Sequence, residues 1–104
     1  MTDELARHVR EALRVVIDPE LGHNIVDLGF VYDISAAGGA VRITMTATTP
    51  GCPAAHFLKE GVANAAGRVA GVRTVDIAMT FDPPWTPSRI EPVTRSSLGF
   101  AAVN

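Results

Sequence analysis

The sequence predicts an α/β (α+β) fold, a two-layer sandwich with two helices on one face of a small three-stranded mixed sheet. An amphipathic stretch opens the chain, two alternating stretches around "AAGGA" follow, and a second helical stretch precedes a third alternating one. This α-β-β-α-β order favours helices on one side of a sheet, followed by a C-terminal arm or short helix. With 104 residues, we expect a single domain over 1–104.

The first helix is expected over "DELARHVREALRVV", where apolar residues recur at helical spacing and charged residues occupy the other face. The stretch "DPELG" follows it. Asp18 suits the N-cap of a single helical turn, Pro19 its first position and Gly22 its exit. We therefore expect a tight turn to connect the first helix to the sheet.

The first two strands should form an antiparallel hairpin around "AAGGA". At least the second half of "NIVDLGFVYDIS" is expected to be a strand, with one face made of Val26, Leu28, Phe30, Tyr32 and Ile34. The next stretch, "VRITMTAT", alternates strictly, and its inward residues are Val41, Ile43, Met45 and Ala47.

A second helix is predicted over "AAHFLKEGVANAAGRVAG", ending at Gly71. The third strand, "VRTVDIAMTF", should run parallel to the second because a β-α-β crossover joins them. After the loop "DPPWTP", a short final helix is expected to be broken at its start by Pro92. Three short strands leave exposed edges, which favours self-association, and we expect a homodimer.

Composition excludes several classes of function. The net charge is −2 and no cluster of Lys and Arg occurs, which argues against nucleic-acid binding. No apolar run approaches the roughly 18–20 residues of a membrane span, and the N-terminus has no signal-peptide core. A single cysteine cannot form an internal disulfide, so we expect a cytoplasmic protein with a reduced thiol.

That cysteine, Cys52, lies in "TTPGCPAA" between the second strand and the second helix. Pro53 fits the first helical position, which places Cys52 at or beside the N-cap. Unpaired N–H groups and the helix dipole favour a thiolate there, as a nucleophile or soft-metal ligand requires. The alternative is that Cys52 is a small buried apolar residue at a strand–helix junction.

Other polar residues also allow two interpretations. His56, four residues after Cys52, either pairs with the thiol in nucleophilic chemistry or metal binding, or is a surface residue. His23, in the loop after "DPELG", is ambiguous. Asp27 lies among apolar neighbours, so its carboxylate needs a partner. That partner is either the backbone N–H groups of a turn or a site beside Cys52. Trp85 either caps the core or anchors a partner.

Four stretches resemble a known family. "IDPELGHNIVDLGFVYD", "ITMTATTPGCPAA", "VDIAMTFDPPWTP" and the closing "LGF" are similar to the SufT/PaaD-like family, over about residues 4 to 100. These small proteins serve iron–sulfur cluster assembly, and their relatives include the eukaryotic cytosolic iron–sulfur targeting component. The resemblance implies a compact α/β domain that acts in the maturation of iron–sulfur proteins.

The resemblance also implies roles for individual residues. It makes Cys52 the functional cysteine, with Asp18 and Glu20 in the "DPE" turn, Asp27 in "VDLG" and Thr49 before "PGC" as supporting residues. Trp85 and Pro87 match the "W.P" element and are expected to bind a partner. The family pattern lends no support to His23 or His56.

These observations predict a non-enzymatic maturation factor. It would use Cys52 to carry, transfer or help insert a transiently bound iron–sulfur cluster into a client apo-protein, beside other iron–sulfur assembly proteins. One thiolate per chain cannot hold a cluster that usually takes four ligands, so a second protomer, a small thiol or a client must contribute, or no cluster binds. The alternative is an adaptor for an apo-enzyme, such as a multicomponent monooxygenase of the phenylacetyl-CoA degradation type. A thiol-dependent enzyme built on Cys52 and His56 is the third hypothesis.

Overall fold

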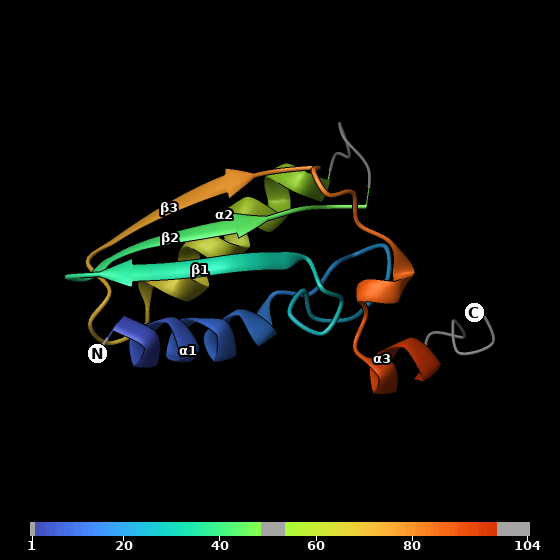
Figure 1. Ribbon diagram of the computed structural model, residues 1–104, viewed down its shortest axis with the longest axis horizontal. Helices are drawn as coiled ribbons and strands as arrows, with labels where there is room; N and C mark the ends of the chain where they lie inside the picture. The colour runs from blue at the N-terminus through green and yellow to red at the C-terminus, as the bar shows by residue number, and fades with distance from the viewer. Residues whose placement is uncertain (1, 49–53, 98–104) are drawn as a thin grey trace.

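The computed structural model describes residues 2–48 and 54–97, and its elements follow the predicted order (Figure 1). A helix and its 3-10 extension open the chain, and a hairpin, a second helix and a third strand follow. The bounds are α1 Thr2–Ala12, η1 Leu13–Val15, β1 Val31–Ala37, β2 Ala40–Met45, α2 Ala54–Gly67 and β3 Thr74–Met79. Two short helices close the described chain, η2 Pro87–Arg89 and α3 Pro92–Ser97.

The three strands form one mixed sheet in the order β1-β2-β3. Strand β1 pairs antiparallel with β2, and β2 pairs parallel with β3, as the hairpin and crossover predict. Ile43 of β2 lies opposite Ile34 of β1 and Ile77 of β3. This register places the apolar residues of all three strands on the same face.

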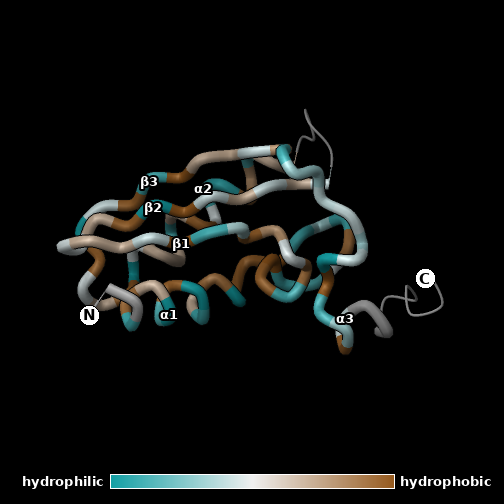
Figure 2. Tube along the Cα trace, in the orientation of Figure 1, coloured by the Kyte–Doolittle hydropathy of each residue, from teal (hydrophilic) through white to brown (hydrophobic). Residues whose placement is uncertain are grey.

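That face forms the core with the two long helices. Helix α1 packs against β1 and α2 against β3. The buried residues of β2 are Val41, Ile43 and Met45, and the helices supply Val9, Leu13, Leu58 and Val62. Polar and apolar positions alternate along the strands in Figure 2, and the opposite face carries the exposed ion pair of Arg42 with Asp76. The predicted two-layer sandwich is confirmed.

Three details differ from the prediction. The strand expected in at least the second half of 24–35 is confirmed, but the alternation expected from Val26 to Ile34 is not kept, because residues 25–29 form a turn and a bulge lies between Val31 and Asp33. Helix α2 ends at Gly67, not at Gly71, which lies in the following turn. Pro92 begins α3 instead of interrupting it, because the first helical position needs no N–H donor.

The segment after β3 returns across the molecule to the turns that precede β1. The N–H of Glu91 donates to the carbonyl of Asp27 at 2.7 Å. Gly29, at φ +78°, lies so close to Arg89 that a Cβ there would be 2.8 Å from the Arg89 carbonyl carbon. Residues 85–94 therefore belong to the same folded unit as residues 24–30. No helix within residues 2–48 and 54–97 has the length and apolar character needed to cross a membrane.

Candidate functional site

The "DPELG" turn is closed by its own hydrogen bonds. The Asp18 carboxylate accepts the N–H of Leu21 at 2.8 Å, and the Asp18 carbonyl accepts the N–H of Gly22 at 2.7 Å. Gly22 has φ +71°, a left-handed conformation that suits glycine. The predicted capping role of Asp18 and exit role of Gly22 are confirmed.

The Asp18 side chain is nevertheless unusual, because only 1% of the residue is exposed. Burial raises the pKa of Asp18 above its ordinary value, and the nearby charge of Glu20 adds to the rise. Backbone hydrogen bonds from Leu21 and Glu20 act in the opposite direction. Ionisation of Asp18 therefore costs more free energy in the folded turn than it does in water.

Glu20 connects this turn to Thr48, in the segment that follows β2. Its carboxylate accepts the hydroxyl of Thr48 at 3.0 Å, across a separation of 28 residues. Thr48 directly precedes residues 49–53, and Ala54 directly after them begins α2. The structure therefore brings Asp18 and Glu20 to the entrance of the segment that contains the cysteine.

Two predicted site residues, Cys52 and Thr49, lie outside the described residues, as does Pro53. Their placement stays a prediction. The described residues on either side frame this segment: Thr48, which follows β2, is bound by Glu20, and the 14-residue helix Ala54–Gly67 begins on the other side. Helix N-termini carry unpaired N–H groups and a partial positive charge.

Asp27 lies in a separate network of side chains. Its carboxylate accepts hydrogen bonds from the Arg14 guanidinium, from Asn24 Nδ2 at 3.1 Å and from the Thr94 hydroxyl at 3.4 Å. Burial acts to raise the pKa of Asp27, but the bonds from Asn24, Arg14 and Thr94 outweigh it and lower the pKa. Of the two expected partners, backbone N–H groups of a turn were wrong: among the described residues the donors to this carboxylate are side chains, from Asn24 three residues away and from Arg14 and Thr94, 13 and 67 residues away.

Trp85 is attached to the core. Its indole N–H donates to the Leu28 carbonyl at 2.7 Å, and its ring meets Phe30 edge to face at 5.3 Å between centroids. Of the two predicted roles, the core cap is confirmed. Pro87, half-buried, begins η2 directly after this loop. Partner binding by Trp85 and Pro87 stays a prediction.

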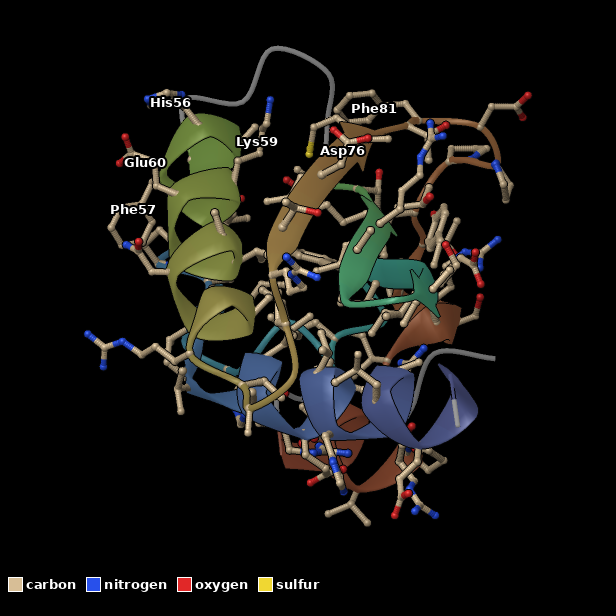
Figure 3. All side chains as sticks on the ribbon, turned by 90° about the vertical axis from the view of Figure 1, so that its left-hand side faces the viewer. His56, Phe57, Lys59, Glu60, Asp76 and Phe81 are labelled. Atoms are coloured by element: carbon tan, nitrogen blue, oxygen red, sulfur yellow. The ribbon has the colours of Figure 1, made fainter. Side chains whose placement is uncertain are left out.

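The histidines contribute no metal site in the described structure. His56 is exposed on α2, where Nε2 lies 3.3 Å from Glu60, and Figure 3 shows both side chains on the side of the helix turned away from β3. The carbonyl of His23 accepts the Asp18 N–H at 2.9 Å. Within residues 2–48 and 54–97, no three His, Cys, Asp or Glu side chains come together as a metal site requires.

Sequence reasoning missed a polar pocket of about 480 Å³ between the end of α1, the start of β1 and the C-terminal segment. Its polar lining comes from Arg10, Tyr32, Arg89 and Glu91. The Tyr32 hydroxyl donates to the Pro83 carbonyl at 2.8 Å, and Arg89 lies over the Tyr32 ring at 4.7 Å. These residues are far apart in the sequence and meet only because the chain folds back, so no local sequence pattern predicts the pocket.

Comparison with known proteins assigns the chain to a family. A family model described as iron-sulfur cluster assembly protein matches residues 6–77. A Porphyromonas gingivalis protein named Fe-S protein maturation auxiliary factor is 43% identical over 89 residues, 85% of each chain. The Bacillus subtilis Fe-S protein maturation auxiliary factor YitW is 36% identical over 100 residues, which are 95% of this chain and 98% of that protein.

The fold agrees with this assignment. A crystal structure of a domain of unknown function from Bacillus anthracis superposes with a TM-score of 0.91 at 34% identity, over 94% of both chains. The family model covers more than two thirds of this sequence, from α1 into β3. The chain therefore belongs to the family of iron–sulfur cluster assembly proteins, as its motifs predict.

Proposed function

We propose that this protein is a maturation factor that carries, transfers or helps insert an iron–sulfur cluster into a client apo-protein through Cys52. The observation that carries the proposal is the hydrogen bond between Glu20 and Thr48, which ties the "DPE" turn to the start of the cysteine segment. Relatives similar over most of their length are named Fe-S protein maturation auxiliary factors, which supports the same role.

In this mechanism Cys52 supplies one thiolate to a cluster that is cargo. Loading requires the thiol to lose its proton, and a position before the N-terminus of α2 favours the thiolate. The remaining ligands come from a small thiol, an assembly protein or the client, since a cluster usually takes four. Asp18 and Glu20 act as positioning residues, because Asp18 closes the turn and Glu20 binds Thr48, directly before the cysteine segment. We expect the protein to have no enzymatic activity and to act in the reducing cytoplasm.

Anaerobic reconstitution with iron and sulfide tests the role of Cys52. We expect the wild-type protein to gain visible absorption and to activate an apo-form of an iron–sulfur enzyme, and Cys52→Ser to lose both. His56→Ala is the matched control, because His56 is exposed, near Cys52 in sequence and paired only with Glu60 in the described structure. Equal client activation by wild type and Cys52→Ser would exclude an essential thiolate. Loss of activity in His56→Ala would instead favour a Cys–His enzyme.

The positioning role of Glu20 has its own test. Glu20→Gln keeps an acceptor for the Thr48 hydroxyl, whereas Glu20→Ala and Thr48→Val each remove the bond. If the bond holds the cysteine segment, Glu20→Ala and Thr48→Val should reduce client activation similarly, and the double variant no further. Additive losses would show that the two residues act separately.

The adaptor function is a second candidate, favoured by the exposed loop at Asp82, Pro83 and Pro84 beside the anchored Trp85. In that case Cys52→Ser would still bind and mature its client. Trp85→Ala is a poor test, because it also removes contacts with Leu28 and Phe30. Pro84→Ser changes an exposed residue but also frees the backbone at that position, so its unfolding is measured beside client binding. Loss of client binding in this variant, with unchanged unfolding, would support the adaptor.

A further inference from the structure

An apolar groove lies between α2 and the segment that follows α1, and one of its lining residues, Ile17, directly precedes the "DPE" turn. It has a volume of about 360 Å³ and is lined by Val15, Ile17, Phe57, Gly61, Asn64 and Arg68, among others. Gly61 allows the close approach of these two segments, because a Cβ there would be 3.2 Å from Val16 Cγ1. We call this surface the α2 groove.

The α2 groove concentrates the exposed apolar side chains of the described structure. Val15 is 74% exposed, Phe57 59% and Ile17 47%, and Val93 is the only other large apolar residue that residues 4–48 and 54–94 leave this open. Figure 3 shows Phe57 projecting from the side of α2 that faces away from β3. An apolar patch of this kind on one face is typical of a protein interface.

The charges on α2 indicate what covers the groove. Arg68 lines it and has no ion-pair partner among the described residues, while Glu60, eight residues earlier, pairs with His56 only at the exposed surface. Asn64 lies midway between them. Eight residues of helix span about 12 Å. Glu60 and Arg68 therefore lie about 6 Å along the helix axis from Asn64, one on either side.

This arrangement is self-complementary. We propose that the α2 groove binds a second copy of this chain, with the two α2 helices antiparallel about a two-fold axis at Asn64. The rotation places Glu60 of each copy opposite Arg68 of the other, so both charges gain a partner. The same contact covers the exposed apolar side chains of both copies. The sheet edges, where sequence reasoning places the homodimer contact, take no part in it.

The geometry of this dimer has a consequence for the cysteines. Ala54 is ten residues from Asn64, so the N-termini of the two α2 helices lie about 30 Å apart along their common direction. The two segments that contain Cys52 would each act alone, and the other cluster ligands would come from outside the dimer. This consequence rests on the proposed function, whereas the dimer itself does not.

Sedimentation velocity over a range of concentrations tests the dimer. We expect wild type to dimerise, and both Arg68→Glu and Glu60→Arg to weaken association by about tenfold or more, since each places like charges together. The double variant, Glu60→Arg with Arg68→Glu, restores the pairing and should restore the dimer. Arg42→Glu is the matched control, because it makes the same charge change on the opposite face of the sheet.

Cross-linking tests the register. In a Cys52→Ser background, Asn64→Cys should form an intermolecular disulfide, because a residue at the two-fold axis faces its own copy. Ala63→Cys, exposed on another side of α2, should not. A wild-type chain that stays monomeric, or a charge swap that fails to restore association, would overturn the proposal. So would a monomer in which Phe57→Asp abolishes client activation, since the groove would then bind the client. The sedimentation and cross-linking results do not depend on reconstitution through Cys52; only the client-activation readout of Phe57→Asp does.

Discussion

Asp18 and Asp27 show that two carboxylates in one short segment experience opposite environments. Asp18 is enclosed, and among the residues that the structure describes only backbone donors meet its charge, so burial dominates and its pKa rises. Asp27 is also partly buried, but Arg14, Asn24 and Thr94 donate to it and its pKa falls. The difference lies in the donors that each carboxylate meets, not in the residue type.

The raised pKa of Asp18 makes a prediction about stability and pH. The ordinary value is 3.8, and the folded value is higher, so the folded state binds more protons between the two values. Stability should therefore fall as the pH rises through this window. Asp18→Asn keeps an acceptor for the Leu21 N–H without the charge. We expect it to be at least as stable as wild type at pH 7, and to lose that advantage below pH 3.8.

Urea unfolding at pH 7 and at acidic pH measures this effect. Asp18→Ala is the comparison, since it removes the cap and should cost about 1 kcal/mol of unfolding free energy. If Asp18→Asn is as unstable as Asp18→Ala at pH 7, the charge itself stabilises the turn. If Asp18→Asn is stable but fails to activate a client, Asp18 acts through its charge in the function.

At the scale of elements, the C-terminal segment is part of the fold rather than an appendage. It is held by the Glu91 N–H on the Asp27 carbonyl, by Trp85 on Leu28 and by the close approach of Arg89 to Gly29. These contacts join η2 and α3 to the turns before β1. The residues proposed to position the cysteine segment, Asp18 and Glu20, lie in the preceding "DPELG" turn.

Gly29→Ala tests this attachment. A Cβ would collide with the Arg89 backbone and would also force φ +78° on a residue with a side chain. We expect a loss of about 2–4 kcal/mol of unfolding free energy, from overpacking and backbone strain together. Fluorescence of Trp85, the single tryptophan, and urea unfolding both report it.

Gly38→Ala is the control for the backbone effect alone. Gly38 has φ +58° in the β1–β2 hairpin, and a Cβ there would meet nothing within 4 Å. It should cost about 1 kcal/mol and leave Trp85 fluorescence unchanged. Equal losses in the two variants would mean that contact with Arg89 is unimportant.

At the scale of the whole molecule, one sheet has two open edges. Strand β2 is paired on both sides, whereas β1 and β3 each have one neighbour within the described chain. An antiparallel α2 dimer covers the helical side and leaves these edges as they are. Protection of the β1 and β3 edges therefore distinguishes a dimer formed through α2 from one formed through the sheet edges.

Amide hydrogen exchange makes that distinction. We expect the β2 amides, such as those of Ile43 and Met45, to exchange only on global unfolding, and the outward amides of β1 and β3 to exchange faster. Raising the protein concentration should slow exchange in neither edge strand. Slower exchange along β3 on association would place the dimer contact at the sheet edge.

The order of the elements, the antiparallel and parallel pairings, and the roles of Asp18 and Gly22 could be predicted from the sequence. Each depends on a local cause: periodicity sets the buried face of a helix or strand, and turn chemistry acts over a few residues. The position of Cys52 between a strand and a helix is predicted in the same way. The chain's motifs also sufficed to indicate its family.

Only the tertiary structure decided which side chains meet. Glu20 binds a residue 28 positions away, Trp85 one 57 away, and Asp27 one 67 away. The bulge in β1 and the α2 groove likewise depend on how elements pack. Local patterns carry no information on such pairs, because their free energy arises only after chain reversal brings distant segments into contact.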